Sequence, residues 1–216
     1  MRILVIGTGT IGRAVVAALS AGNEIISASL RSTTLKVNIA DPASIQQMYR
    51  SLGKLDAVVC AAGPAKFAPL ARLSDADFRF SLDNKLMGQV NAVRFGFEHV
   101  QDGGSFTLTA GSLAQAPMPG SAAVSLVNAG IEGLARAAAL EAPRRIRVNA
   151  VSPPWVTETL QALKMDLSEG LPAGVVARAY VRSVTGTAPV RYLSPLPSRD
   201  ANSFLVKLVL RSKFAG

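Results

Sequence analysis

One short segment near the start of the chain limits the possible folds more than any other. Residues 2–6 (RILVI) have the pattern of a buried strand, and a GxGxxG turn follows at once and opens a stretch with helical spacing. In such a turn the glycines allow a tight bend, close approach of the backbone to a pyrophosphate, and packing of helix on strand. The helix N-terminus also favours phosphate. The pattern therefore predicts a dinucleotide site rather than a plain strand-to-helix turn, with contacts from Gly7, Thr8, Gly9, Thr10, Ile11 and Gly12.

The end of the second predicted strand indicates which dinucleotide is bound. An NAD site usually carries Asp or Glu about 20 residues past the glycines, where it binds the ribose 2′-hydroxyl. This chain has Ser27-Ala28-Ser29-Leu30-Arg31-Ser32 in that region, with no acid. Arg31 can bind a 2′-phosphate with help from Ser29 or Ser32, so the sequence favours NADP(H) over NAD(H). The alternative is that Arg31 is an ordinary solvated arginine.

Apolar strand patterns alternate with longer helical patterns, which is typical of a parallel sheet with helices on both faces. We expect strands at 2–6, 24–29, 35–39, 56–61, 105–109 and 147–152, and helices at 11–21, 42–52, 75–100, 122–140 and 172–183. The 75–100 helix is expected to be interrupted near its start, and a turn is expected at 102–104. These elements predict one α/β domain over residues 1–188, a Rossmann-type doubly wound sheet with its ligand at the carboxyl ends of the strands.

Residues 189–216 are predicted to form an atypical basic tail that supplies +4 of the net charge of +9. Within it, residues 204–210 have the pattern of a strand or a short helix. Basic residues are scattered over the whole chain without an aromatic ladder, so we expect no nucleic-acid partner. No apolar stretch approaches the length of a membrane span, and we expect no membrane partner.

Several motifs occur in an order that resembles the short-chain dehydrogenase/reductase family. After the glycine turn come Cys60–Gly63, Asn84–Gly88, Thr107–Thr109, Ile131–Leu134 and Arg147–Pro153. The resemblance covers about residues 1–185. It implies a nicotinamide-dependent oxidoreductase with cofactor contacts at Asn38, Ala61, Ala62, Gly63, Asn128, Pro153, Trp155 and Val156. Trp155 is equally well explained as a core aromatic.

The resemblance also implies an altered proton relay. The family uses a tyrosine as proton donor with a lysine four residues later, and these positions fall on Val124 and Asn128, which supply neither a proton nor a charge. The family's serine position falls on Ala110. The candidate catalytic residues are therefore Asn84, which matches the family's helix asparagine, with Ser112 and Lys85; Ser121 and Ser125 are further hydroxyls. The ordinary alternatives are a solvated Lys85 and a loop hydroxyl at Ser112.

Three functions are compatible with these residues. The first is an NADP(H)-binding oxidoreductase acting on a small carbonyl or alcohol substrate, with a degenerate proton relay. The second is a non-redox isomerase, cyclase or dehydratase on the same scaffold, and the third is a cofactor-sensing protein without turnover. The family resemblance favours the first, although fold alone does not separate them.

The small number of histidine and cysteine side chains limits what can be expected of metal binding and of the cellular compartment. One histidine, His99, and one cysteine, Cys60, cannot supply the usual transition-metal ligand sets, so no metal is expected. A strand pattern in place of a signal peptide at the start, together with a single cysteine, leads us to expect a cytoplasmic protein. The resemblance implies a homodimer or homotetramer that packs through the helices at 75–100 and 122–140.

Overall fold

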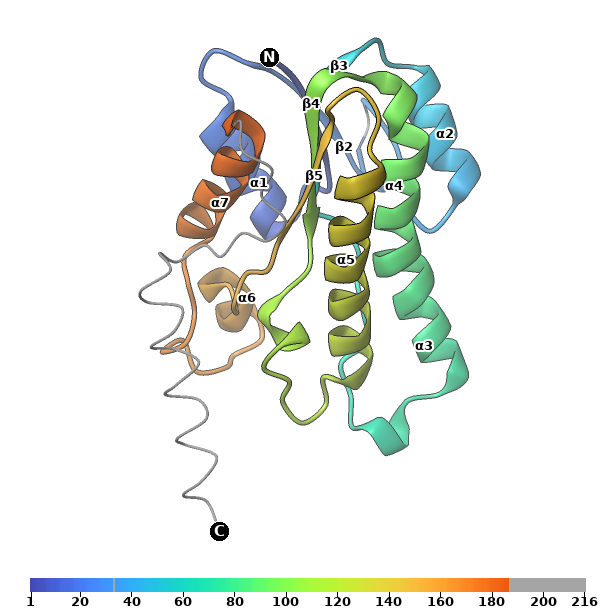
Figure 1. The fold of residues 1–216 in the computed structure, drawn as a ribbon. Helices are drawn as coiled ribbons and strands as arrows, with labels where there is room; N and C mark the ends of the chain where they lie inside the picture. The colour runs from blue at the N-terminus through green and yellow to red at the C-terminus, as the bar shows by residue number, and fades with distance from the viewer. Residues whose placement is uncertain (33, 187–216) are drawn as a thin grey trace.

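The computed structural model describes residues 1–32 and 34–186, which form a five-stranded parallel sheet (Figure 1). The strands lie in the order β2-β1-β3-β4-β5. The predicted α/β class and the Rossmann-type, single-domain arrangement are confirmed. The tail at 189–216, including the pattern at 204–210, lies outside the described residues. The strands are β1 (Arg2–Ile6), β2 (Glu24–Ala28), β3 (Leu55–Cys60), β4 (Val100–Thr109) and β5 (Arg147–Val151).

Helices cover both faces of the sheet because successive residues of each buried strand point in opposite directions. In β1, Ile3 and Val5 join the apolar cluster under α1 (Thr10–Leu19) and α7 (Ala173–Thr185). Leu4 and Ile6 join the cluster on the other face, under α2 (Pro42–Arg50), α4 (Gly88–Gly96) and α5 (Ala122–Glu141). Figure 1 shows α1 and α7 on one side of the sheet and the other three helices on the opposite side.

By length and composition, α5 is the one helix among the described residues that could cross a membrane. In this fold it packs on the sheet beside β5 and β4. Val127, Ile131 and Ala135 are completely buried along its inner side. Its apolar character is therefore explained by its place in the core of the domain.

The strand predicted at 35–39 is wrong. The chain after β2 turns back on itself, and Ser32 Oγ accepts hydrogen bonds from the backbone N–H groups of Thr34 and Leu35. Within the described part of this segment, the pairing is limited to a single bridge between Ser29 and Lys36. Val37 and Ile39 are nevertheless buried. The apolar pattern therefore reflects burial under α2 and α4 rather than a sixth strand.

The long helix predicted at 75–100 has its irregular part in the middle rather than near its start. It comprises α3 (Asp75–Ser81), a π-helical segment at Leu82–Met87, α4, and a 3₁₀ turn at Phe97–His99. A π-helical segment widens the helical turn locally and is frequently found at functional sites. Here it turns the side chains of residues 82–87 relative to those of a regular helix.

The turn predicted at 102–104 is also wrong, because these residues lie inside β4. Leu55 pairs with Val100, whereas Ala57 pairs with Ser105, so β4 carries extra residues between the two pairs. Gly103 has a φ of +75°, which suits a glycine in such a bulge. The short helix α6 (Thr157–Ala162) was not predicted. The other predicted helices and strands are confirmed, with ends shifted by up to two residues except in β4, which starts five residues before the predicted 105.

Candidate functional site

The glycine turn lies at the point where the strand order of the sheet reverses. β1 is flanked by β2 on one side and β3 on the other. Gly7 follows β1 and Ala61 follows β3, and the Ala61 N–H donates to the Ile6 carbonyl at 2.8 Å. In open α/β sheets, ligands bind in the crevice outside the strand ends at this reversal. The predicted glycine turn and the predicted ligand position therefore coincide.

Each glycine of the turn has a different surrounding. Gly7 has a φ of +103°, and a Cβ there would lie 2.7 Å from the Ala61 carbonyl oxygen. A Cβ on Gly12 would lie 1.8 Å from the Gly7 carbonyl oxygen. A Cβ on Gly9, in contrast, would meet nothing within 4 Å among the described residues. Gly7 and Gly12 are therefore needed for packing, whereas Gly9 faces open space next to the start of α1, which has no side-chain cap in the described chain.

Arg13 is a neighbour of this turn that the sequence motif did not single out. It is exposed in the first turn of α1, and its guanidinium donates to the Thr8 carbonyl at 3.2 Å. A positive charge is thereby held against the glycine turn. The signal that could have identified it is a basic residue directly after the last glycine of the motif.

In the region expected to bind the adenosine end, Arg31 is an exposed cation, and the side chains of Ser32 and Asn38 already accept hydrogen bonds. Arg31 is exposed and makes no hydrogen bond or ion pair within the described residues. Ser32 Oγ is already an acceptor for two backbone N–H groups of its own loop. Asn38 Oδ1 accepts from the Ala40 N–H at 3.2 Å, and its side chain is exposed. Of these three side chains, that of Arg31 is the most accessible to a ligand.

Lys85 lies at the carboxyl edge of the sheet, in the π-helical segment between α3 and α4. It packs against Gly63, where a Cβ would lie 2.8 Å from the Lys85 Cα. Its Nζ donates to the Ala110 carbonyl at 3.4 Å, just past the end of β4. Burial lowers the pKa of this ammonium to about 8, since the charged form loses hydration. Lys85 is thus partly buried against this edge of the sheet, with its ammonium beside a backbone carbonyl.

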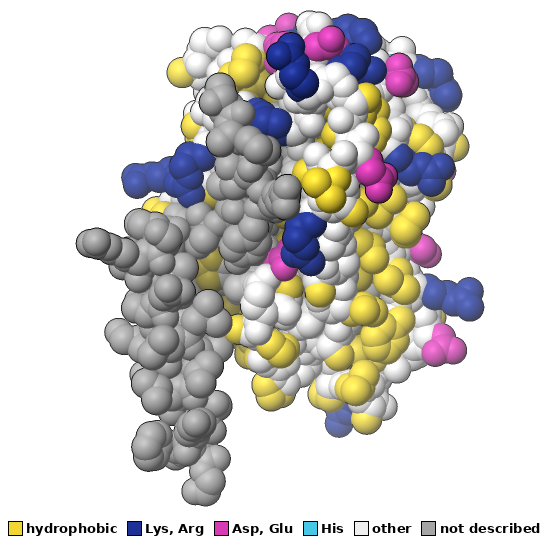
Figure 2. All heavy atoms as spheres, in the orientation of Figure 1, with side chains coloured by type: hydrophobic (Ala, Val, Ile, Leu, Met, Phe, Trp, Pro, Cys, Tyr) yellow, Lys and Arg dark blue, Asp and Glu magenta, His cyan; other side chains and the backbone are white. Residues whose placement is uncertain are grey.

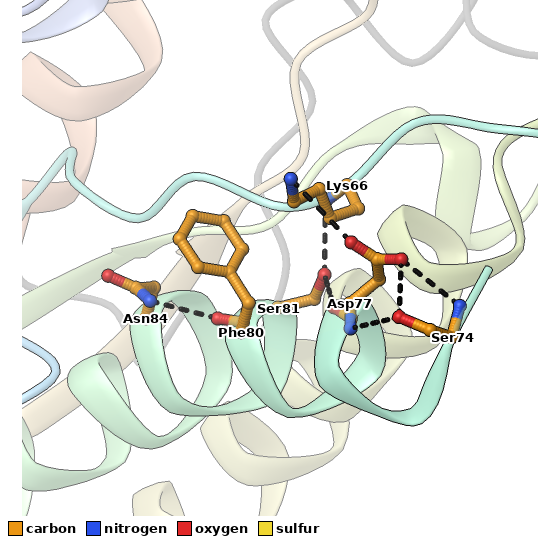
Figure 3. Close-up of polar contacts among 6 residues, drawn as sticks. All are labelled: Lys66, Ser74, Asp77, Phe80, Ser81 and Asn84. Carbon is orange, nitrogen blue, oxygen red and sulfur yellow. Dashed lines mark hydrogen bonds and ion pairs between the residues drawn. The ribbon is translucent and has the colours of Figure 1, made fainter.

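Asn84, the neighbouring candidate, turns toward its own helix. Its Nδ2 donates to the Phe80 carbonyl at 3.0 Å (Figure 3). The preceding turn is held by a capping box, in which Ser74 and Asp77 bind each other's backbone N–H groups. The structure therefore brings Lys85, and not the side chain of Asn84, against the carboxyl end of β4.

Two contacts in Figure 3 fix the loop after β3 over this helix. The Lys66 backbone N–H donates to Ser81 Oγ at 3.0 Å, and Lys66 Nζ forms an ion pair with Asp77 at 3.6 Å. The ion pair is exposed, and such pairs contribute little to stability. The buried hydroxyl of Ser81 is the firmer anchor. Together they hold the loop beyond Gly63 close to the π-helical segment.

Gln89 is a buried polar residue that sequence reasoning missed. Its Nε2 donates to the Thr109 carbonyl at 2.9 Å, and its Oε1 accepts from the Thr109 N–H at 2.8 Å. This pair of bonds ties α4 to the end of β4, one turn after Lys85. The sequence signal is weak: a glutamine among the mostly apolar residues 86–93.

The asparagine and serine candidates lie on α5 and on the loop after β4. Asn128 is buried on α5, and its Oδ1 has no hydrogen-bond partner among the described residues. A Cβ on Gly111 would lie 2.7 Å from Asn128 Nδ2, so the glycine lets the amide approach this loop closely. Ser112 follows, and its N–H donates to the Pro153 carbonyl at 2.9 Å. Ser121 and Ser125 are hydrogen-bonded to each other at 3.0 Å, at the start of α5.

Comparison with known proteins assigns the family. A family model described as enoyl-(acyl carrier protein) reductase matches residues 13–194. The chain belongs to the short-chain dehydrogenase/reductase family. It is similar to a solved protein, lin1944 from Listeria innocua, with 38% identity and a TM-score of 0.85 over 90% of this chain and 98% of that one. A small-chain dehydrogenase solved in complex with NADPH shares the fold, with 23% identity and a TM-score of 0.76 over 89% of this chain and 94% of that one.

Curated relatives of this short-chain dehydrogenase/reductase include two named reductases. A hydroxynaphthalene reductase from Aspergillus fumigatus is 34% identical over 113 residues, which is 52% of this chain and 41% of the relative. A 3-oxoacyl-acyl-carrier-protein reductase from Staphylococcus aureus is 29% identical over 154 residues, which is 68% of this chain and 63% of the relative. The chain thus spans about half the length of the curated relatives it matches.

An aromatic pair borders the site of this short-chain dehydrogenase/reductase. Trp155 and Phe67 meet edge to face, with ring centroids 6.1 Å apart. They come from the loops after β5 and β3, and Pro153 and Val156 are buried on either side of the tryptophan. Trp155 itself is half-buried, so it is not a core aromatic. This pair joins two loops at the carboxyl edge of the sheet.

Within residues 1–32 and 34–186, no group of three or more His, Cys, Asp or Glu side chains is arranged to hold a metal ion. Most of the predicted site residues converge on the carboxyl edge of the sheet. Asn84 turns back on its own helix, and Asn38 is used within its own loop.

Proposed function

We propose that this protein is an NADP(H)-dependent oxidoreductase that acts on a small carbonyl or alcohol substrate. The observation that carries the proposal is the glycine turn at the strand reversal, where Gly9 faces open space at the start of α1. Backbone N–H groups at a helix N-terminus bind phosphate, so a pyrophosphate fits this position. Relatives named as reductases, and a protein of the same fold solved with NADPH, support the proposal.

The preference for NADP(H) rests on Arg31 and on the missing acid. An acid at the end of β2 would repel a 2′-phosphate, whereas Arg31 is exposed and uncommitted within the described residues. A guanidinium bound to a phosphate forms charge-assisted hydrogen bonds, which are about twice as strong as neutral ones. The contacts to the nicotinamide end are proposed from Ala61, Ala62, Gly63, Asn128 and the Pro153–Val156 loop.

The first experiment is a titration with NADPH and, separately, with NADH, followed by Trp155 fluorescence or calorimetry. We expect tighter binding of NADPH. Arg31→Ala is expected to weaken NADPH binding about tenfold or more, since a hydrogen bond to a charged group contributes roughly 1.5–3 kcal/mol. NADH binding is expected to change little.

Arg50→Ala is the matched control, because Arg50 lies on α2 and its guanidinium contacts only Gln47 among the described residues. Equal affinities for NADPH and NADH would contradict the cofactor preference. A protein that binds neither would contradict the proposed function. A carbonyl substrate converted with loss of NADPH absorbance supports the oxidoreductase; product formed without that loss favours the non-redox enzyme, and binding without turnover favours the cofactor sensor.

We also propose a homodimer or homotetramer in the cytoplasm, formed through α3, α4 and α5. Figure 2 shows hydrophobic side chains gathered over the face where these helices lie. Phe80, Met87, Leu126 and Leu140 are among the exposed large hydrophobic residues of these segments. Contiguous exposed apolar surface of this kind marks contact sites between subunits. Sedimentation velocity of the purified protein tests the proposal.

A further inference from the structure

Two polar side chains near the end of β4 have incomplete hydrogen bonding within the described residues. Within the described residues, the Lys85 ammonium has one hydrogen-bond contact, to the Ala110 carbonyl at 3.4 Å, which is longer than a good hydrogen bond. Asn128 is 2% exposed, and its Oδ1 has no partner in the same part of the chain. A buried polar group left without a partner costs about 1–3 kcal/mol. Both side chains lie beside the residues that follow β4, and each keeps hydrogen-bonding capacity that a bound ligand can use.

The backbone is shaped to bring these two side chains to one place. Gly63 is a glycine with a φ of +124° and lies against Lys85, where any larger side chain would collide with the lysine backbone. Gly111 leaves room for the Asn128 amide in the same way. The lysine contacts residue 110 and the amide contacts residue 111, so both flank the same short segment after β4. Their convergence therefore depends on two glycines in two different loops.

The chemistry of the pair is complementary. A lysine ammonium only donates hydrogen bonds, whereas an amide oxygen only accepts them. A carbonyl oxygen can accept from the ammonium, and a hydroxyl can also donate to the amide oxygen. Reduction converts the carbonyl group of the substrate into the hydroxyl group of the product. The pair therefore has a suitable partner for the oxygen of both the substrate and the product.

We propose that Lys85 is the general acid of this enzyme and that Asn128 positions the oxygen that Lys85 protonates. This inference rests on the proposed function. The carbonyl carbon accepts the hydride that NADPH supplies, the C=O π bond opens, and the carbonyl oxygen takes a proton from Lys85 Nζ. The products are the alcohol, NADP⁺ and a neutral amine, which regains its proton from water. The lysine thus comes from the π-helical segment and the amide from α5, the reverse of what the family resemblance implies.

The electrostatic surroundings of Lys85 suit this role. Burial lowers the pKa of the ammonium to about 8, so it is protonated at neutral pH and releases its proton readily. Among the described residues, the titratable group that acts on it is the Cys60 thiol on β3. Burial raises the pKa of that thiol to about 12, so it is neutral in the working range and does not hold the ammonium in an ion pair.

The test combines lysine variants with single-turnover oxidation of NADPH. The probes are ethyl acetoacetate, benzaldehyde and phenanthrenequinone, chosen as three unrelated carbonyl classes. Lys85→Met is expected to lower the rate about 100-fold or more, the usual contribution of a general acid, while NADPH affinity stays near the wild-type value. Lys54→Met is the matched control, because Lys54 Nζ also donates to a backbone carbonyl, that of Glu98, but near the opposite end of the sheet.

Further readouts separate a proton donor from a residue that only supports the fold. The wild-type reduction rate is expected to fall above about pH 8. Lys85→Arg is expected to be slow and to lack that fall, because arginine keeps its proton and is therefore a poor acid. Added ethylamine is expected to restore part of the rate in Lys85→Ala. Asn128→Leu is expected to raise the KM of the carbonyl more than it lowers kcat. Circular dichroism checks that each variant folds.

Cofactor binding by the wild type tests the proposed function, and the lysine variants test the role of Lys85. A wild-type protein that binds neither NADPH nor NADH refutes the proposed function. A wild-type protein that binds NADPH, together with a Lys85→Met variant that turns over normally, refutes only the role of Lys85. That role is equally refuted if the wild type binds NADPH but reduces none of the three probes, or if neither the pH profile nor ethylamine distinguishes the lysine variants.

Discussion

The glycine turn and the opposite half of the strand edge are built in different ways. In the turn, Gly7, Gly9 and Gly12 are close in sequence, and each has the surroundings that its place in the motif requires. At the end of β4, Lys85 and Asn128 come from separate helices, and separate glycines make room for them. The first region is a local motif, and the second is a product of tertiary packing. The glycine turn thus depends on residues close in the chain, whereas the placement of Lys85 and Asn128 depends on the packing of two helices against the end of β4.

Replacing glycines of the turn is expected to have the largest effect. Gly12→Ala places a Cβ 1.8 Å from the Gly7 carbonyl oxygen, so the strand and helix must move apart. We expect loss of NADPH binding and a fall of about 3 kcal/mol in the free energy of unfolding. Gly9→Ala is the matched variant, because its Cβ meets nothing within 4 Å among the described residues.

Gly9→Ala is therefore expected to keep the stability of the fold while weakening NADPH binding. Urea denaturation and calorimetric titration of both variants give the two quantities. If Gly9→Ala binds NADPH as tightly as the wild type, the pyrophosphate does not lie in the open space beside Gly9. The glycine turn would then not be the cofactor site.

The second effect concerns the stability cost of Lys85. Burial lowers its pKa from 10.5 to about 8 in the folded chain, so the unfolded chain holds more protons between these values. The free energy of unfolding should accordingly rise with pH over that window. Lys85→Met removes the buried charge, and we expect it to raise the free energy of unfolding at neutral pH by roughly 2–3 kcal/mol.

Urea denaturation near pH 7 and near pH 10 measures this effect, with Lys54→Met as the control. The difference between wild type and Lys85→Met should shrink as pH rises toward the lysine's unfolded value of 10.5. A Lys85→Met variant that is less stable than the wild type at neutral pH would show that the ammonium supports the fold, and that its place at the strand edge needs no functional explanation.

The smallest effect is expected from Arg13. Its guanidinium is exposed and held against the glycine turn through the Thr8 carbonyl. Arg13→Ala should weaken NADPH and NADH binding by similar factors, about threefold to tenfold, since one exposed charged contact contributes around 1 kcal/mol. Comparison with Arg31→Ala sharpens the assignment, because only Arg31 should discriminate between the two cofactors. A selective loss of NADPH binding in Arg13→Ala would indicate that Arg13, and not Arg31, binds the 2′-phosphate.

Local patterns predicted much of the fold because β1 to β5, α1, α2, α5 and α7 each bury a face with their own periodicity. Local patterns gave wrong predictions where the environment of a segment is set by elements distant in the chain. Residues 35–39 are apolar because Val37 and Ile39 lie in the core, and a single bridge takes the place of the expected strand. Gly103 is typical of a turn, and it has the positive φ of one, but neighbouring strands keep it inside β4 as a bulge.

The candidate site shows the same division. The glycine turn, Ala61–Gly63 and Arg31 could be predicted, since strand ends and motif spacing place them at the edge of the sheet. Asn84 and Lys85 could not be ranked by spacing, because a π-helical segment decides which of the two side chains faces β4. Gln89 carries no signal of its role, which depends on the Thr109 backbone lying opposite it.

By itself, the sequence determined the α/β class, the position of the glycine turn and the kind of residues that border the strand ends. These depend on interactions between residues close in the chain: strand periodicity, helix starts and the conformational freedom of Gly7. Only the tertiary structure decided that Lys85 and Asn128 flank the same backbone segment, and that Gly63 and Gly111 admit them. Those contacts join residues far apart in the chain, and their geometry is set by the packing of whole helices on the sheet.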